Sequence, residues 1–374
     1  IHLRDTRVAL DGRSVHLDTL DLLATRREGD RLLAMRSEAF RLRARGNYQF
    51  SQVLRDVQQL IHEYQLNFQG DARATEAYYR RKRRQATPDY NIDLTLDLKR
   101  PDPLLRVFVP ALSISDSTHI EGSFRNGATS ILQLGGSARA VQYDSIRAEQ
   151  VSFDLLTSKL PDAPDVLAQA SVTSTRQRLP GLGRTEQFYA EGVWDQDKIN
   201  FSSSLAQSGT TNRAQINGAL DFLPNAVQIV FRKSGVNLLG RDWIIAQDNA
   251  IVIAGGGHEI TVPNFSLSNG SQQILATGEV SDDPSRTLHL EVKDLQLGTL
   301  SPLTNQNMRG RVNATGDVRG VFGQLVAASR LTVDSLYFDN TLIGNVTGVA
   351  NWDNTASRLG TNLSVMRDGQ NVLS

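Results

Sequence analysis

The sequence contains no cysteine. Disulfide bonds therefore do not stabilise the fold, and thiolate catalysis, zinc–thiolate sites and iron–sulfur clusters are excluded. Aromatic residues make up only 6% of the chain, and 40 basic residues balance 40 acidic ones. A surface that binds nucleic acid normally leaves a basic excess, so we do not expect nucleic acid as the main partner.

Long hydrophobic runs are also lacking. No segment approaches the roughly 18 apolar residues that a membrane-spanning helix needs, and polar residues interrupt the most apolar stretch, 243–257. The chain begins at Ile1 in the middle of a pattern and ends at Ser374 in a strand-like run. We interpret it as an internal or C-proximal piece of a longer protein, with any membrane association through segments outside it.

Sequence motifs of the common enzyme classes are missing as well. The sequence contains neither a complete nucleophile elbow nor a Walker motif, and residues 181–186 lack the third glycine of a dinucleotide-binding loop. The six histidines are scattered without the spacing of metal ligands, and no pair of carboxylates stands out. We therefore expect a protein that is not an enzyme and that binds neither a metal nor a cofactor.

From residue 91 onward, short runs alternate apolar and polar residues and end in turns rich in Gly, Asn and Asp. A period of two places alternate side chains on one face of a strand. The unequal spacing of the turns favours an antiparallel meander of about 25 strands with one apolar face. The residues expected to line that face are Ile92, Leu94, Leu96, Leu98, Val151, Phe153, Leu155, Val227, Ile229, Phe231, Leu288, Leu290, Val292, Leu331 and Val333.

Residues 51–68 break the alternation, because their apolar residues recur with a period of 3.6 and predict one amphipathic helix. This helix either packs on the sheet or lies on a membrane. The basic run that follows consists of Arg80, Arg81, Lys82, Arg83 and Arg84. It is typical of a solvated helix end or loop; contacts with anionic phospholipid headgroups and, third, RNA are the alternatives. The expected organisation is strands over 1–50, helix and basic linker over 51–90, and a continuous sheet over 91–374.

The apolar face must be covered by something, because exposed apolar surfaces beyond a few hundred square ångströms are rare unless they bind a partner. One solution is a closed barrel or sandwich whose interior is filled with side chains. The other is a bent sheet whose trough accepts acyl chains. The lining residues are mostly Leu, Val and Ile, which suits a smooth hydrocarbon-lined trough.

Several segments resemble the TamB family, the translocation and assembly module proteins of the AsmA-like superfamily. They are residues 46–50, which lead into the helix at 51–68, and residues 103–112, 120–122, 308–320, 331–339 and 342–353. The likeness covers most of the chain, although each motif is of low complexity.

The resemblance implies an elongated, U-shaped β groove in the periplasm of a Gram-negative bacterium. Members of the family are anchored in the inner membrane, reach towards an outer-membrane barrel protein, carry phospholipids and assist outer-membrane protein assembly. We therefore expect a non-enzymatic, bridge-like lipid transport protein whose groove shields acyl chains across the periplasm. The alternatives are a structural or adhesive β protein with a filled interior and a carbohydrate-active enzyme, which would need clustered carboxylates and surface aromatics.

Overall fold

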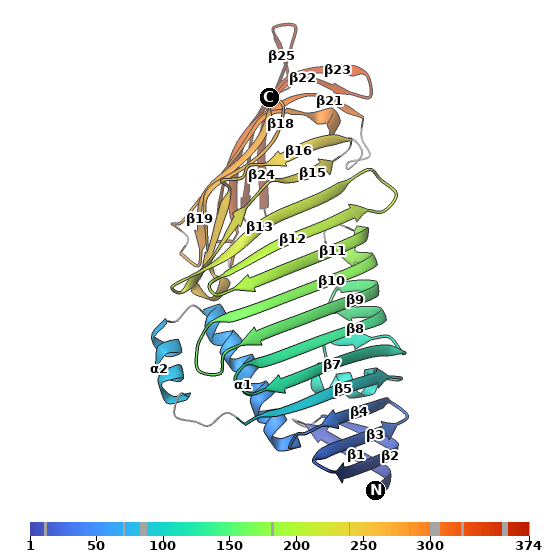
Figure 1. The fold of residues 1–374 in the computed structure, drawn as a ribbon. Helices are drawn as coiled ribbons and strands as arrows, with labels where there is room; N and C mark the ends of the chain where they lie inside the picture. Colours follow the sequence, from blue (N-terminus) through green and yellow to red (C-terminus); the bar gives the residue numbers. More distant parts are fainter. Residues whose placement is uncertain are drawn as a thin grey trace. The chain divides into compact units, whose positions relative to one another are not determined.

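The computed structural model describes residues 1–10, 13–69, 72–82, 88–180, 183–238, 240–283, 285–299, 307–322, 325–353 and 358–373. Within these residues the chain forms 25 strands and three α-helices, and neighbouring strands pair in antiparallel orientation (Figure 1). The mainly β, antiparallel architecture and the expected number of strands are therefore confirmed. Arg83 and Arg84 of the basic run lie outside the described residues.

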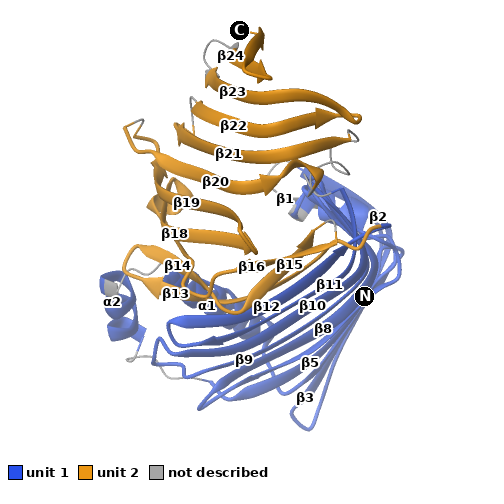
Figure 2. Ribbon diagram, turned by 90° about the horizontal axis from the view of Figure 1, so that it is seen from above, with its two compact units in different colours: residues 1–209 blue, residues 210–374 orange. Residues whose placement is uncertain are grey.

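The chain divides into two compact units, residues 1–209 and residues 210–374 (Figure 2). The helices of unit 1 are α1 (Phe50–Gln69), α2 (Ala72–Lys82) and α3 (Asp102–Phe108). Its strands are β1 (His2–Leu10), β2 (Arg13–Arg27), β3 (Asp30–Ser37), β4 (Phe40–Gly46), β5 (Tyr90–Leu98), β6 (Leu112–Ile114), β7 (Thr118–Asn126), β8 (Ser130–Tyr143), β9 (Ile146–Lys159), β10 (Val166–Leu179), β11 (Gly183–Asp195) and β12 (Lys198–Gln207).

Unit 2 consists of strands with two short 3₁₀ turns, η1 (Gly255–Gly257) and η2 (Leu297–Thr299). Its strands are β13 (Arg213–Leu223), β14 (Ala226–Phe231), β15 (Ser234–Leu238), β16 (Arg241–Ile245), β17 (Ala250–Ala254), β18 (Glu259–Asn269), β19 (Gln272–Ser281), β20 (Leu288–Gln296), β21 (Met308–Arg319), β22 (Val326–Phe338), β23 (Thr341–Asp353), β24 (Arg358–Arg367) and β25 (Gln370–Leu373).

In both units most strands pair with the strand that follows them in the chain, whereas β5 pairs with β7, β6 with β8, β14 with β17, and β13 and β16 pair additionally with β15 and β18, respectively. Tight hairpins make the pairing of successive strands possible. The two residues between β24 and β25, Asp368 and Gly369, have φ values of 51° and 77°. Positive φ at both central positions is the geometry whose twist matches a right-handed β-hairpin, and Asp-Gly adopts it readily. This turn agrees with the expectation that the strands end in turns rich in Gly, Asn and Asp.

Some strands contain a shift in register. In unit 2, such shifts surround Asp294 of β20 and Ser335 of β22, where φ is 52° and 50°. The amide of Asp294 donates to Oδ1 of Asn313, and that of Ser335 to Oδ1 of Asn345, both at 2.9 Å. These side chains satisfy backbone donors that have left the ladder. β-Bulges of this kind bend and twist a strand.

Unit 1 contains a comparable irregularity in β11. The register shifts between Glu186 and Tyr189, and Gln187 between them has a φ of 55°. The long strands β8 to β11 are drawn as curved ribbons in Figure 2. An inserted residue breaks the period of two, so side-chain parity cannot be carried along a strand across the bulge.

Helix α1 confirms the helix predicted at 51–68 and begins one residue earlier. It packs on a buried cluster formed with the sheet, which contains Ala44, Tyr48, Leu60, Tyr90, Ile92 and Phe124. The other two helices are not predicted by the sequence analysis. Helix α2 occupies part of the expected linker, and α3 interrupts the strands expected beyond residue 91, where Val107 packs against Val15 and Leu17 of β2.

Candidate functional site: the apolar sheet face and helix α1

In unit 1 the register aligns the predicted apolar residues in rows across the strands. One row contains Leu94 and Leu155, and the next contains Leu96 and Phe153. Residues paired across antiparallel strands lie on the same face of the sheet. The first row runs Leu33, Ala44, Leu94, Gly122, Leu134, Leu155, Ala170, Gly192 and Phe201, and the second Met35, Leu42, Leu96, Ile120, Gly136, Phe153, Val172, Ala190 and Ser203.

The remaining predicted residues of unit 1 are also paired with identifiable neighbours. Ile92 pairs with Phe124, Leu98 with Phe40 and Thr118, and Val151 with Ala138. The opposite face of the same strands is polar: Leu156, next to Leu155, lies between Gln133 and Gln169.

In unit 2 the predicted residues of β20 and β22 share one face, because Val292 and Leu331 both pair with Ala314. Within this unit the ring of Phe231 lies 5.9 Å from that of Phe265, which belongs to the row of Leu290 through Ala276. Ile229 pairs with Leu220 and Ile251, and Val227 with Phe222 and Ile253. Val333 packs with Val346 and Val365 in a small buried cluster. Leu288 pairs with Gly278 and Val318.

Most of the predicted lining residues are half-buried. Ile92 and Val333 are the buried members of the set, whereas Leu290 is exposed. Intermediate exposure means that these side chains neither stand free in solvent nor lie under a complete second layer.

Helix α1 covers one end of this face. Its Leu60 is buried against Ile92 and Phe124, and Leu94 is packed against the same cluster. At the far end of the helix, the ring of Phe68 lies 4.6 Å from the indole of Trp194, at the end of β11. The helix therefore crosses the ends of the strands from β4 to β11, as its position beside them in Figure 1 indicates.

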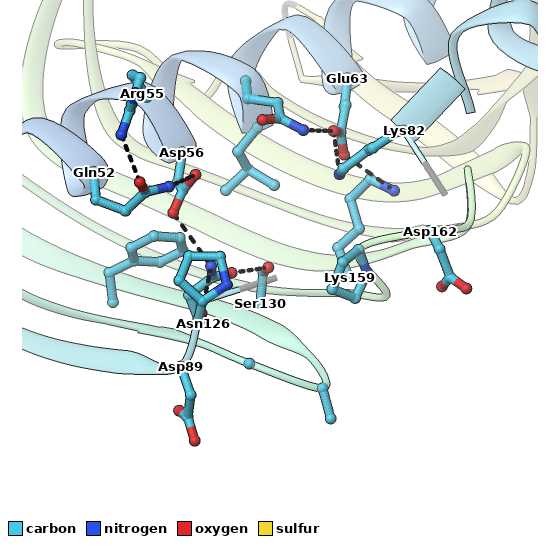
Figure 3. A pocket seen from close by; sticks show the side chains of 17 residues that line it. Gln52, Arg55, Asp56, Glu63, Lys82, Asp89, Asn126, Ser130, Lys159 and Asp162 are labelled. Carbon is cyan, nitrogen blue, oxygen red and sulfur yellow. Dashed lines mark hydrogen bonds and ion pairs between the residues drawn. The ribbon is translucent and has the colours of Figure 1, made fainter. Parts of the chain in front are cut away.

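A buried ionic cluster fixes the far half of α1. Glu63 is fully buried, and its carboxylate accepts hydrogen bonds from the hydroxyls of Tyr78 (2.8 Å) and Tyr79 (3.2 Å) of α2. It also pairs with Lys82 of α2 and, at 3.5 Å, with Lys159 at the end of β9. One carboxylate thus connects α1, α2 and the sheet (Figure 3).

Burial sets the protonation behaviour of this cluster. It lowers the pKa of Lys159 to about 8, although the nearby Glu63 carboxylate opposes the shift. Burial also raises the pKa values of Tyr78 and Tyr79, and the Glu63 charge raises them further. The tyrosines therefore remain neutral hydrogen-bond donors well beyond physiological pH.

A second polar group holds the near half of α1. The Asp56 carboxylate accepts hydrogen bonds from the Tyr90 hydroxyl (2.7 Å), Gln52 (2.9 Å) and Asn126 Nδ2 (3.3 Å). Asn126 accepts in turn from the Ser130 hydroxyl at 2.6 Å. Between this group and the Glu63 cluster lies a cavity of about 720 Å³ (Figure 3). Lys82 and Lys159 both pair with Glu63, whereas the donors to Asp56 are uncharged.

The predicted headgroup contacts are placed differently from one another. Arg80 pairs with Glu76 on the exposed surface of α2, and Arg81 is exposed. Lys82 is directed inward to Glu63. The basic run alone could not reveal the ionic cluster or α2, because the same residues are equally compatible with a solvent-exposed helix end or loop. The signal that could have indicated them is Glu63, an acidic residue beside the apolar side chains with which α1 packs on the sheet.

In the described part of the chain, no group of three or more His, Cys, Asp or Glu side chains could hold a metal ion. The helices found there lack the length and apolar character needed to cross a lipid bilayer. Comparison with models of known families, with curated proteins and with solved structures gives no match.

Proposed function

We propose that this chain is a non-enzymatic lipid conduit, in which the apolar sheet face shields phospholipid acyl chains while the headgroups remain in water. The observation that carries the proposal is the register of unit 1, which aligns half-buried apolar side chains in rows across β3 to β12. Each buried CH₂ group gains roughly 0.8 kcal/mol without directional constraint, so a chain held by many such contacts can slide.

The cellular setting belongs to the same proposal and depends on the family resemblance of the sequence. It places the chain in the periplasm of a Gram-negative bacterium, between an inner-membrane anchor outside this chain and an outer-membrane barrel protein. Its role there would be phospholipid transport and outer-membrane biogenesis.

Strand β9 offers a matched pair of variants. Leu155 lies on the apolar face between Leu134 and Ala170, whereas the adjacent Leu156 lies on the polar face with 47% of its surface exposed. Leu155→Arg places a charge among acyl chains, and Leu156→Arg places the same charge in water. Leu94, by contrast, packs against the buried apolar cluster between α1 and the sheet, so a charge there would also disturb the helix.

The test is the uptake of a fluorescent phospholipid from vesicles by the purified chain. We expect uptake by the wild type and by Leu156→Arg, and a loss of at least about ten-fold in Leu155→Arg, because a buried charge costs more than one factor of ten in binding. Equal uptake by the two variants, or none by the wild type, would refute the proposal.

A structural or adhesive protein with a filled interior is the second candidate. It is favoured by the burial of Ile92 under α1 and of Val333 in its own cluster. This candidate predicts that the wild type takes up no lipid and that Leu155→Arg unfolds at a lower urea concentration than Leu156→Arg.

A further inference from the structure

Helix α1 carries a second apolar surface outside the buried cluster that it forms with the sheet. Four large side chains of the helix are about half exposed: Phe50 (57%), Leu54 (50%), Ile61 (51%) and Phe68 (48%). They follow one another at intervals of four, seven and seven residues. At about 100° per residue, this spacing places them within about 40° of a single line along the helix. We call these four residues the α1 stripe.

The direction of the stripe follows from helical geometry. Leu60 points into the buried cluster on the sheet, and the next residue, Ile61, is rotated from it by about 100°. Val57 and Tyr64 lie between these two directions on the helix surface, and both pack against the cluster. The α1 stripe therefore lies beside the contact with the sheet rather than opposite to it.

The stripe adjoins the apolar face of the sheet. The ring of Phe68 packs at 4.6 Å on Trp194, and Tyr64 packs on the same indole at 5.7 Å. Trp194 pairs with Ala168, on the face that carries the apolar rows. Helix and sheet thus form the two sides of an apolar corner.

Among the described residues, the open flank of the α1 stripe carries uncharged side chains. The residues that flank the α1 stripe on its open side are Ser51, Gln58 and Gln65, which are exposed and uncharged. Asp56 and Glu63, on the far flank of the helix, are engaged in the two polar groups under α1. A charged ligand therefore finds no partner along the stripe itself, whereas an uncharged one meets no buried charge.

We propose that the α1 stripe forms a wall of the conduit, so that one acyl chain lies in the corner between the stripe and the sheet rows of unit 1. This inference rests on the proposed function and assigns a position to its ligand. The stripe extends over about 27 Å of helix, and a lipid tail spans roughly 15 Å, half of a bilayer core. The corner is therefore long enough to hold a tail along its whole length.

A hydrocarbon chain suits this corner better than an extended peptide does. The backbone groups of β4 to β11 are already paired with neighbouring strands. A peptide laid on the face would leave its own N–H and C=O groups unsatisfied, whereas a hydrocarbon has none to satisfy. A partner helix satisfies its own backbone, so the experiment must separate that occupant from a lipid.

The probe is a phosphatidylethanolamine with a diazirine in the middle of one acyl chain, photolysed with the full chain and mapped by peptide mass spectrometry. The variants are Ile61→Gln in the stripe and Arg55→Gln on the charged side of the same helix. We expect the wild type and Arg55→Gln to be labelled on both α1 and β9. Ile61→Gln should lower the labelling of α1 about ten-fold, as expected when roughly two methylene groups lose apolar contact.

The outcomes separate this inference from the proposed function. Labelling of β9 without labelling of the stripe would overturn the inference and leave the conduit standing. No labelling of the protein would overturn both. A dimer of the wild type that Ile61→Gln converts to a monomer in sedimentation would show that a second copy occupies the stripe, which also overturns the inference.

Discussion

Replacement of Glu63 by Gln tests whether the buried ionic cluster fixes α1 to the sheet. The substitution keeps the shape of the side chain and removes its charge, which leaves Lys159 buried without its carboxylate partner. Breaking a buried ion pair from one side typically costs about 3–5 kcal/mol. Since Lys82 loses the same negative charge and the two tyrosine hydroxyls are left with one neutral acceptor oxygen, we expect a loss at the upper end of this range. Domains are commonly stable by only about 5–15 kcal/mol, so the effect should be large.

The measurement is the free energy of unfolding of unit 1 in urea, followed by circular dichroism and by hydrogen exchange of the α1 amides. Glu76→Gln is the matched control, because Glu76 pairs with Arg80 on the exposed surface of α2. Exposed pairs contribute about 0–1 kcal/mol. If Glu63→Gln destabilises the protein no more than Glu76→Gln does, the cluster does not hold the helix and our reasoning is wrong.

Three further predictions concern the fold. Between about pH 8 and pH 10.5, the unfolded chain should bind more protons than the folded chain at Lys159, because burial lowers the pKa of this residue to about 8. The free energy of unfolding of the wild type relative to Lys159→Met should therefore rise with pH over this window, by about 3 kcal/mol in total; a flat difference would contradict the shift. Leu60→Ala should cost about 2–4 kcal/mol and speed hydrogen exchange in α1, because Leu60 is buried under the helix; unchanged exchange would contradict this role. Asn313→Ala should cost about 1–2 kcal/mol in urea unfolding, because the amide of Asp294 loses its acceptor; a neutral effect would show that the bulge does not need it.

The alternating pattern was sufficient to predict the class of fold. Runs such as residues 91–98 have a period of two that only a strand satisfies, and the turn at Asp368 and Gly369 has the residues that a tight hairpin requires. The helix at 51–68 was equally predictable, because its apolar residues repeat with a period of 3.6 over several turns.

The details that depend on tertiary contacts could not be predicted in the same way. A bulge such as that at Asp294 inserts one residue, and nothing in the local pattern says which residue leaves the ladder. Helix α3 has only seven residues, too few for a helical period to distinguish it from a short strand. The role of Lys159 depends on a partner 96 positions away in the sequence, since Glu63 reaches it only after α1 has packed on the sheet.

The most direct test of the account is native mass spectrometry of the chain isolated from Gram-negative membranes, performed in parallel on the wild type and on Leu155→Arg. The account predicts phospholipid masses bound to the wild type and strongly reduced in Leu155→Arg, with both proteins folded by circular dichroism. A folded wild-type chain that carries no phospholipid would contradict it.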